Sequence, residues 1–158
     1  MKKFVKRNTI FLLTLCATSF ACATENMSEL EMELFNAGLI DEDLKYTDLQ
    51  EVGKYFQSQN KMLSVSLPSK IDSLMEVSSI LLTPYYMGYT FKFDAPISKD
   101  KFKRMHDDLN STNTKNKLCQ EMYTERLYKV NNVVIGINYI DTSMKSIANV
   151  ELNPKTCI

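Results

Sequence analysis

The first 23 residues constrain this chain most, because they have the layout of a secretory signal peptide. Residues 1–7 carry four basic side chains and no acidic one, residues 10–20 are largely apolar, and Ala21-Cys22-Ala23 forms a small-residue cleavage site. The apolar run is too short to span a bilayer. We therefore predict that residues 1–23 are removed on export. A single domain, residues 24–158, then folds in an oxidising compartment, periplasmic or extracellular.

Composition limits the classes of partner. Removing the leader leaves 135 residues, enough for one domain with its own core. Removal also takes Lys plus Arg from 19 to 15 against 19 acidic residues, so the mature chain has a net charge near −4. An acidic chain lacks the basic footprint of a nucleic-acid-binding protein. No second apolar stretch reaches transmembrane length, so we expect neither a nucleic-acid partner nor a membrane span in the mature chain.

Two cysteines remain after the leader, Cys119 and Cys157, and they allow one intramolecular pairing. A bridge between them closes a loop of about 38 residues, which stabilises the fold by about 4 kcal/mol in the chain-entropy model. A redox or metal pair is the alternative, but the chain has no Cys-x-x-Cys and only one histidine. We predict a structural disulfide between Cys119 and Cys157.

Cys22 raises a second possibility, a lipid anchor at the N-terminus. Lipoprotein signals place a small residue directly before the cysteine and a branched aliphatic residue three positions before it. Ala21 fits this pattern, whereas Ser19 and Phe20 fit it poorly. The sequence therefore favours a soluble product over a lipid-anchored one.

Two capping boxes predict two N-terminal helices, one opened by Ser28 with Glu31 and one by Thr47 with Gln50. Gly53 lies inside the second helix, where it weakens the helix and would permit a close approach to a sheet. The inner face of this helix is predicted from apolar residues at helical spacing, Leu49, Val52 and Phe56.

Alternation of apolar and polar residues then predicts strands. The predicted strands cover residues 63–67, 71–83, 89–93, 133–140 and 148–152. Residues 133–140 form the most hydrophobic of these, which predicts a central position in the sheet. Residues 84–88 and 141–145 are the predicted hairpin connections.

The middle of the chain predicts further helices. Ser98 is the expected N-cap of a helix that follows Pro96, residues 110–116 are expected to form a polar loop, and a short helix carries Cys119. The order of elements predicts an α+β fold, with an antiparallel sheet of four to five strands. The N-terminal and middle helices cover one face of this sheet, and one disulfide closes the domain.

The residues suited to chemistry form no catalytic or metal-binding pattern. His106 precedes Asp107, but adjacent residues on a helix do not face one another. The acidic residues 41–43 lack the loop of a calcium site and match helix N-terminal acids. Glycine-rich phosphate-binding motifs are absent from the sequence. We therefore expect no catalytic residue, cofactor or metal, and a protein that is not an enzyme.

Tyr85, Tyr86 and Met87 are the candidate contact residues for a protein partner. A soluble monomer normally places small polar residues in a hairpin connection, whereas exposed aromatic side chains serve as anchors at interfaces. The alternative, that this run is an ordinary turn rim beside the core, stays open.

The stretch 67–158 resembles small exported bacterial proteins that are mostly uncharacterised. The shared layout consists of Leu67-Pro68, Ile71-Asp72, the aromatic strand 89–93, Cys119, Asn138-Tyr139-Ile140-Asp141 and Cys157. The chain departs from it in lacking a glycine in the last turn and a clean lipoprotein signal. A similar layout occurs in secretion pilotins and pilus accessory proteins. The resemblance implies a helix-plus-sheet domain that binds a partner segment.

Three functional hypotheses follow. The first is a non-enzymatic periplasmic interaction protein, of the kind that assists an envelope secretion or pilus system. The alternative is a periplasmic inhibitor or immunity protein that blocks a toxin or hydrolase with a protruding loop near residues 85–88. The third, an enzyme, requires a polar pocket with converging titratable groups.

Overall fold

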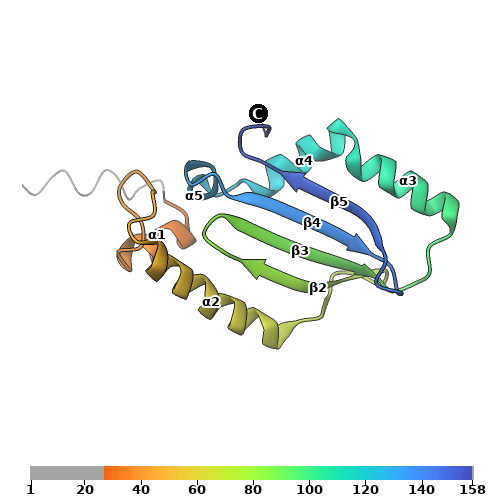
Figure 1. The fold of residues 1–158 in the computed structure, drawn as a ribbon, viewed down its shortest axis with the longest axis horizontal. Helices are drawn as coiled ribbons and strands as arrows, with labels where there is room; N and C mark the ends of the chain where they lie inside the picture. Colours follow the sequence, from red (N-terminus) through yellow and green to blue (C-terminus); the bar gives the residue numbers. More distant parts are fainter. Residues whose placement is uncertain (1–26, 158) are drawn as a thin grey trace, which may run out of the picture.

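The computed structural model describes residues 27–157, which form a five-stranded sheet flanked by helices (Figure 1). The predicted leader, its cleavage site and Cys22 lie outside the described residues. The helices are α1 (Glu29–Asn36), α2 (Leu49–Ser66), α3 (Lys99–Asn110), α4 (Thr112–Met122) and α5 (Arg126–Val130). The strands are β1 (Ser69–Lys70), β2 (Met75–Leu82), β3 (Tyr86–Phe93), β4 (Val134–Ile140) and β5 (Ser146–Leu152).

The sheet follows the chain order β1-β2-β3-β4-β5, and its neighbouring strands are antiparallel except for β3 and β4. The predicted α+β class is confirmed, but the sheet is mixed instead of antiparallel throughout. A parallel pair needs a long crossover between its strands, and α3, α4 and α5 supply it. The most hydrophobic strand, β4, is interior as expected, although β3 is the middle strand.

The predicted capping box at the start of α1 is confirmed and also has a second function. The Ser28 side chain accepts a hydrogen bond from the Glu31 amide, and Glu31 Oε2 accepts one from the Ser28 amide at 3.1 Å. Glu31 is fully buried, and its Oε1 accepts a bond from the Leu127 amide of α5 at 2.9 Å. Ser28 also donates to the Glu125 carboxylate. One buried carboxylate therefore satisfies the N-termini of two helices.

Three expectations for α2 are corrected. Its N-cap is Asp48, one residue after the predicted Thr47, and Asp48 Oδ1 accepts bonds from two first-turn amides. The helix continues to Ser66, so the predicted strand 63–67 is wrong. Apolar residues two apart over five positions are too short a pattern to exclude a helix. A side chain at Gly53 would have no atom within 4 Å, so that glycine makes no close approach to the sheet.

The second half of α2 is fastened to the edge of β2 by one side chain. Asn60 Nδ2 donates to the Leu82 carbonyl at 2.8 Å, and the Leu82 amide donates to Asn60 Oδ1 at 2.8 Å. β1 covers only Glu76 and Val77 of β2, so the end of β2 near Leu82 has an uncovered edge. The Asn60 side chain pairs with that edge as a neighbouring strand would, and this limits pairing with another chain.

Residues 110–116 are largely helical, so the predicted polar loop is wrong. Ser98 caps α3 as expected, but a single residue, Ser111, separates α3 from α4. Its side chain accepts a hydrogen bond from the Thr114 amide and caps α4. Serine, threonine and asparagine favour both loops and helix starts, so composition alone predicted the wrong element.

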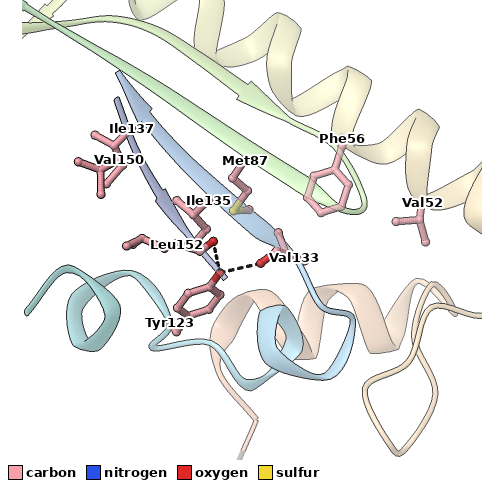
Figure 2. Packing of buried hydrophobic residues seen from close by; sticks show 9 residues of the cluster. All are labelled: Val52, Phe56, Met87, Tyr123, Val133, Ile135, Ile137, Val150 and Leu152. Carbon is pink, nitrogen blue, oxygen red and sulfur yellow. Dashed lines mark hydrogen bonds between the residues drawn. The ribbon is translucent and has the colours of Figure 1, made fainter. Parts of the chain in front are cut away.

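The core forms between the helices and one face of the sheet (Figure 2). Tyr123, which follows α4, is its central polar residue: its hydroxyl oxygen lies 2.8 Å from the Val133 carbonyl oxygen and 3.0 Å from that of Leu152. The start of β4 and the end of β5 are therefore joined through one buried phenol. The residues around it are Val52, Phe56, Met87, Val133, Ile135, Ile137, Val150 and Leu152.

The predicted disulfide between Cys119 and Cys157 is present, with the Cα atoms 5.4 Å apart. It joins α4 to the segment that follows β5. Because Tyr123 contacts the same end of β5, two separate links hold α4 to the C-terminal edge of the sheet.

Candidate binding surface

The sheet has a second face, opposite the core, which we call the open face. Side chains alternate along a strand, so Met87 and Tyr89 point to the core while Tyr86, Gly88 and Thr90 belong to the open face. Gly88 is paired with Gly136 across the parallel strands β3 and β4. The middle of the open face therefore carries two adjacent glycines.

The Tyr86 ring occupies the space above these glycines. A Cβ atom at Gly136 would lie 2.1 Å from Tyr86 Oη, and one at Gly88 would lie 3.0 Å from Tyr86 Cε1. Any side chain at Gly136 would displace the ring. Tyr86 is still 40% exposed, so the side of the ring that faces away from the backbone is accessible.

A shallow hollow of about 540 Å³ surrounds this ring. All of its lining side chains are uncharged, and hydroxyl and amide groups are prominent among them. Ser146 Oγ donates to Asn138 Oδ1 at 3.0 Å across the hollow. The lining residues are Ser79, Leu81, Tyr86, Gly88, Tyr89, Thr90, Gly136, Asn138, Ser146 and Asn149.

The structure separates the three predicted contact residues. Tyr85 is 53% exposed in the turn before β3, and its ring meets that of Tyr46 edge-on, with centroids 6.2 Å apart. Tyr86 lies on the open face. Met87 is 3% exposed and belongs to the core, so its prediction as a surface contact is wrong. The reason is that β3 begins at residue 86, earlier than predicted, and the alternation turns Met87 inward.

Tyr46, which contacts Tyr85, is a partly buried tyrosine whose hydroxyl oxygen is fully buried. Its hydroxyl has no hydrogen-bond partner within residues 27–157. Burial is the main cause that raises the pKa of Tyr46 far above its ordinary value, and the neighbouring Tyr85 adds to the shift. The Tyr46 amide donates a hydrogen bond to Asn131 Oδ1 at 3.1 Å. This bond holds Tyr46, on which the Tyr85 ring rests, against the end of α5.

The residues considered for chemistry have structural or solvent-facing positions. His106 lies on the exposed side of α3, and its Nδ1 is 3.3 Å from Asp107 Oδ1, so these neighbours do meet. Asp41 Oδ1 accepts a bond from the Lys45 amide and closes a turn. Over the described range 27–157, the acidic, histidine and cysteine side chains make no group of three that could hold a metal ion.

The glycine pair is the feature that sequence reasoning missed. Each glycine lies between two large apolar or aromatic neighbours in the sequence, and such a glycine in a strand often marks a close approach. The parallel pairing that places them side by side was not visible in the sequence.

In the part of the chain that the structure describes, no helix is both long and apolar enough to cross a membrane.

Neither a known protein family nor a curated protein sequence matches the chain. Among solved structures, it is similar to a candidate secreted protein from Pseudomonas aeruginosa, with a TM-score of 0.52 and 13% identity over 72% of this chain and 99% of that one. The resemblance to small exported helix-plus-sheet proteins is thereby confirmed at the level of the fold.

Two pilotins of type II secretion systems are also similar. They are EpsS of Vibrio vulnificus, with a TM-score of 0.37 and 11% identity over 70% of this chain and 94% of that one, and AspS of Vibrio cholerae, with 0.43 and 12% over 69% and 94%. At these TM-scores the likeness carries no inference about binding.

Proposed function

We propose that this protein is a non-enzymatic component of the bacterial envelope that binds a protein partner through Tyr85. The observation that supports the proposal most is the half-exposed Tyr85 ring, which rests edge-on against the partly buried Tyr46. An aromatic ring held in place loses little entropy when it binds, which suits it to an anchor role.

The surroundings of Tyr85 support the same role. The Val134 amide donates to the Tyr85 carbonyl at 2.9 Å, which fixes the backbone of the turn against β4. Val130, at the end of α5, is an apolar side chain that is 39% exposed, and it directly precedes Asn131, which binds the Tyr46 amide. The disulfide is consistent with a periplasmic location. The narrower hypothesis of a secretion or pilus accessory rests on the sequence resemblance alone.

The inhibitor hypothesis loses the feature that motivated it. It required a protruding loop near residues 85–88, but residues 86–88 belong to β3. The turn is closed tightly, since the Thr83 amide donates to the Tyr86 carbonyl at 2.8 Å and the Tyr86 amide donates to Thr83 Oγ1 at 2.9 Å. We therefore propose a surface contact in place of an inserted loop.

A photo-crosslinking amino acid at position 85 tests the proposal in cells that express the full chain. We expect a discrete protein adduct from position 85 and none from position 64, an exposed serine in the second half of α2. Tyr85→Ala should weaken capture of the crosslinked protein by about 30-fold, the usual hot-spot scale, while Tyr85→Phe should keep most of the affinity. Equal adducts at both positions, or full capture by a folded Tyr85→Ala protein, would contradict it.

A further inference from the structure

Beyond this protein contact, we propose that the hollow on the open face binds a neutral carbohydrate chain, with the Tyr86 ring as the surface on which a sugar stacks. The platform residue directly follows Tyr85 in the chain, but its side chain belongs to the open face, and the proposal does not depend on the protein partner.

The platform is built at a cost to the sheet. Glycine in a strand interior lowers stability because it packs no side chain and has more backbone freedom to lose. Here two glycines are in register, and the Tyr86 ring fills the space of both missing side chains. The result is an aromatic surface resting on backbone, with its outer side accessible. The face of a sugar ring that carries C–H groups is apolar and fits such a surface.

A row of uncharged polar side chains runs beside the platform. Strand pairing places Ser79 opposite Thr90, Thr90 opposite Asn138, and Asn138 opposite Asn149. The row therefore crosses four strands and is about 15 Å long at the usual strand spacing. Hydroxyl and amide groups both donate and accept hydrogen bonds, as the hydroxyl groups of a sugar do. Such a row matches a short oligosaccharide chain.

Charge and backbone pairing exclude other ligand classes from this hollow. Its lining side chains are uncharged, so it offers no ion pair to an anionic or cationic ligand. Of the nearby charges, Glu76 and Lys92 pair with each other at 3.4 Å. The exposed Glu151 lies opposite Gly136 on β5, beside the hollow, where its carboxylate would repel an anionic ligand. An extended peptide normally adds to a strand edge, but β3 and β4 are paired on both sides. The uncharged lining therefore favours a neutral ligand that is bound through side chains.

The full chain is expressed, and the protein is purified from the periplasm. It is then titrated with three neutral trisaccharides, tri-N-acetylchitotriose, cellotriose and maltotriose. Binding is followed by NMR. We expect at least one trisaccharide to bind with a Kd of about 1 mM or tighter, and to shift the signals of Gly88, Gly136 and Asn149. Tyr86→Ala should weaken binding at least tenfold, whereas Tyr86→Phe, which keeps the ring, should change it by less than about threefold.

Asn149→Asp provides a second variant if Tyr86→Ala fails to fold, because Asn149 is exposed and its replacement places a charge in the polar row. It too should weaken binding about tenfold. Tyr85→Ala is the matched control and should bind sugar normally. Absence of shifts with all three trisaccharides at about 10 mM, or undiminished binding by folded Tyr86→Ala or Asn149→Asp, would overturn the proposal. Crosslinking at position 85 should not respond to sugar, so the two proposals fail separately.

Discussion

The two flanks of the sheet differ in how completely their strands are buried. In the C-terminal flank, made of β4, β5 and α4, four residues of each strand are buried. In the N-terminal flank, made of β2 and α2, the strand residues are half-buried or exposed throughout. Further along α2, Met62 and Val65 are 66% and 87% exposed. Stability is therefore concentrated in the C-terminal flank.

The fastening of the helices explains this difference. On the C-terminal flank, α4 is held by the disulfide and by Tyr123, and both links reach the end of β5. On the N-terminal flank, α2 places Val52 and Phe56 in the core from its first half, while its second half is joined to β2 through Asn60. The strands β2 and β5 are therefore buried by their helices to different extents, although both contain alternating apolar residues.

Loss of the disulfide should have the largest effect on this comparison. Replacing Cys119 and Cys157 by serine removes a constraint between residues 38 positions apart, a segment that includes β4 and β5. We expect the free energy of unfolding in urea to fall by about 2–4 kcal/mol. A loss below about 0.5 kcal/mol would show that the C-terminal flank does not depend on the bridge.

Tyr123→Phe should come next. At neutral pH we expect a loss of about 1–3 kcal/mol, because the carbonyls of Val133 and Leu152 lose a buried donor. Burial raises the pKa of Tyr123 to about 12 in the folded state, against about 10 when unfolded. The unfolded chain therefore ionises first, and this stabilising contribution is lost between pH 10 and 12. Urea unfolding across that range should show the gap between wild type and variant narrowing. A constant gap would contradict the role of the phenol.

The smallest effect is expected from Asn60→Ala on the N-terminal flank. The variant loses both bonds to Leu82, but water can replace them at a partly exposed edge, so about 1 kcal/mol is expected. Hydrogen exchange should accelerate at the Leu82 amide and leave the amides of β5 unchanged. Gln57→Ala, an exposed position on the same helix, is the control. A loss as large as that of the disulfide would reverse the ranking of the two flanks.

Local signals in the sequence predicted many elements correctly. The Ser28 cap, the Ser98 cap, the last hairpin and the disulfide were all visible as short patterns. In the hairpin after β4, Met144 takes the left-handed conformation with φ 65° that a glycine normally supplies. The Asp141 side chain fixes this turn by accepting bonds from the amides of Ser143 and Lys145.

Features that depend on contacts between distant residues could not be predicted. The parallel pairing of β3 with β4 depends on the path of the helices between them, and the glycine platform depends on that pairing. The prediction for Met87 failed because the exact start of a strand decides which face each residue takes. The sequence therefore could not predict which face of β3 each of these neighbouring side chains takes.

The carboxylate shared by α1 and α5 sets an order of events during synthesis. Glu31 and Leu34 emerge early, but their partner Leu127 lies far along the chain, 96 positions after Glu31. At ordinary synthesis rates this corresponds to a delay of about 5–20 s. Throughout that delay the first helix has the nearby Ile40 and Leu44 of its apolar cluster, but it lacks both Leu127 and the amide that its buried carboxylate will bind. The N-terminal segment is therefore among the first parts to be made, yet its buried carboxylate stays without its second partner until most of the chain has been made.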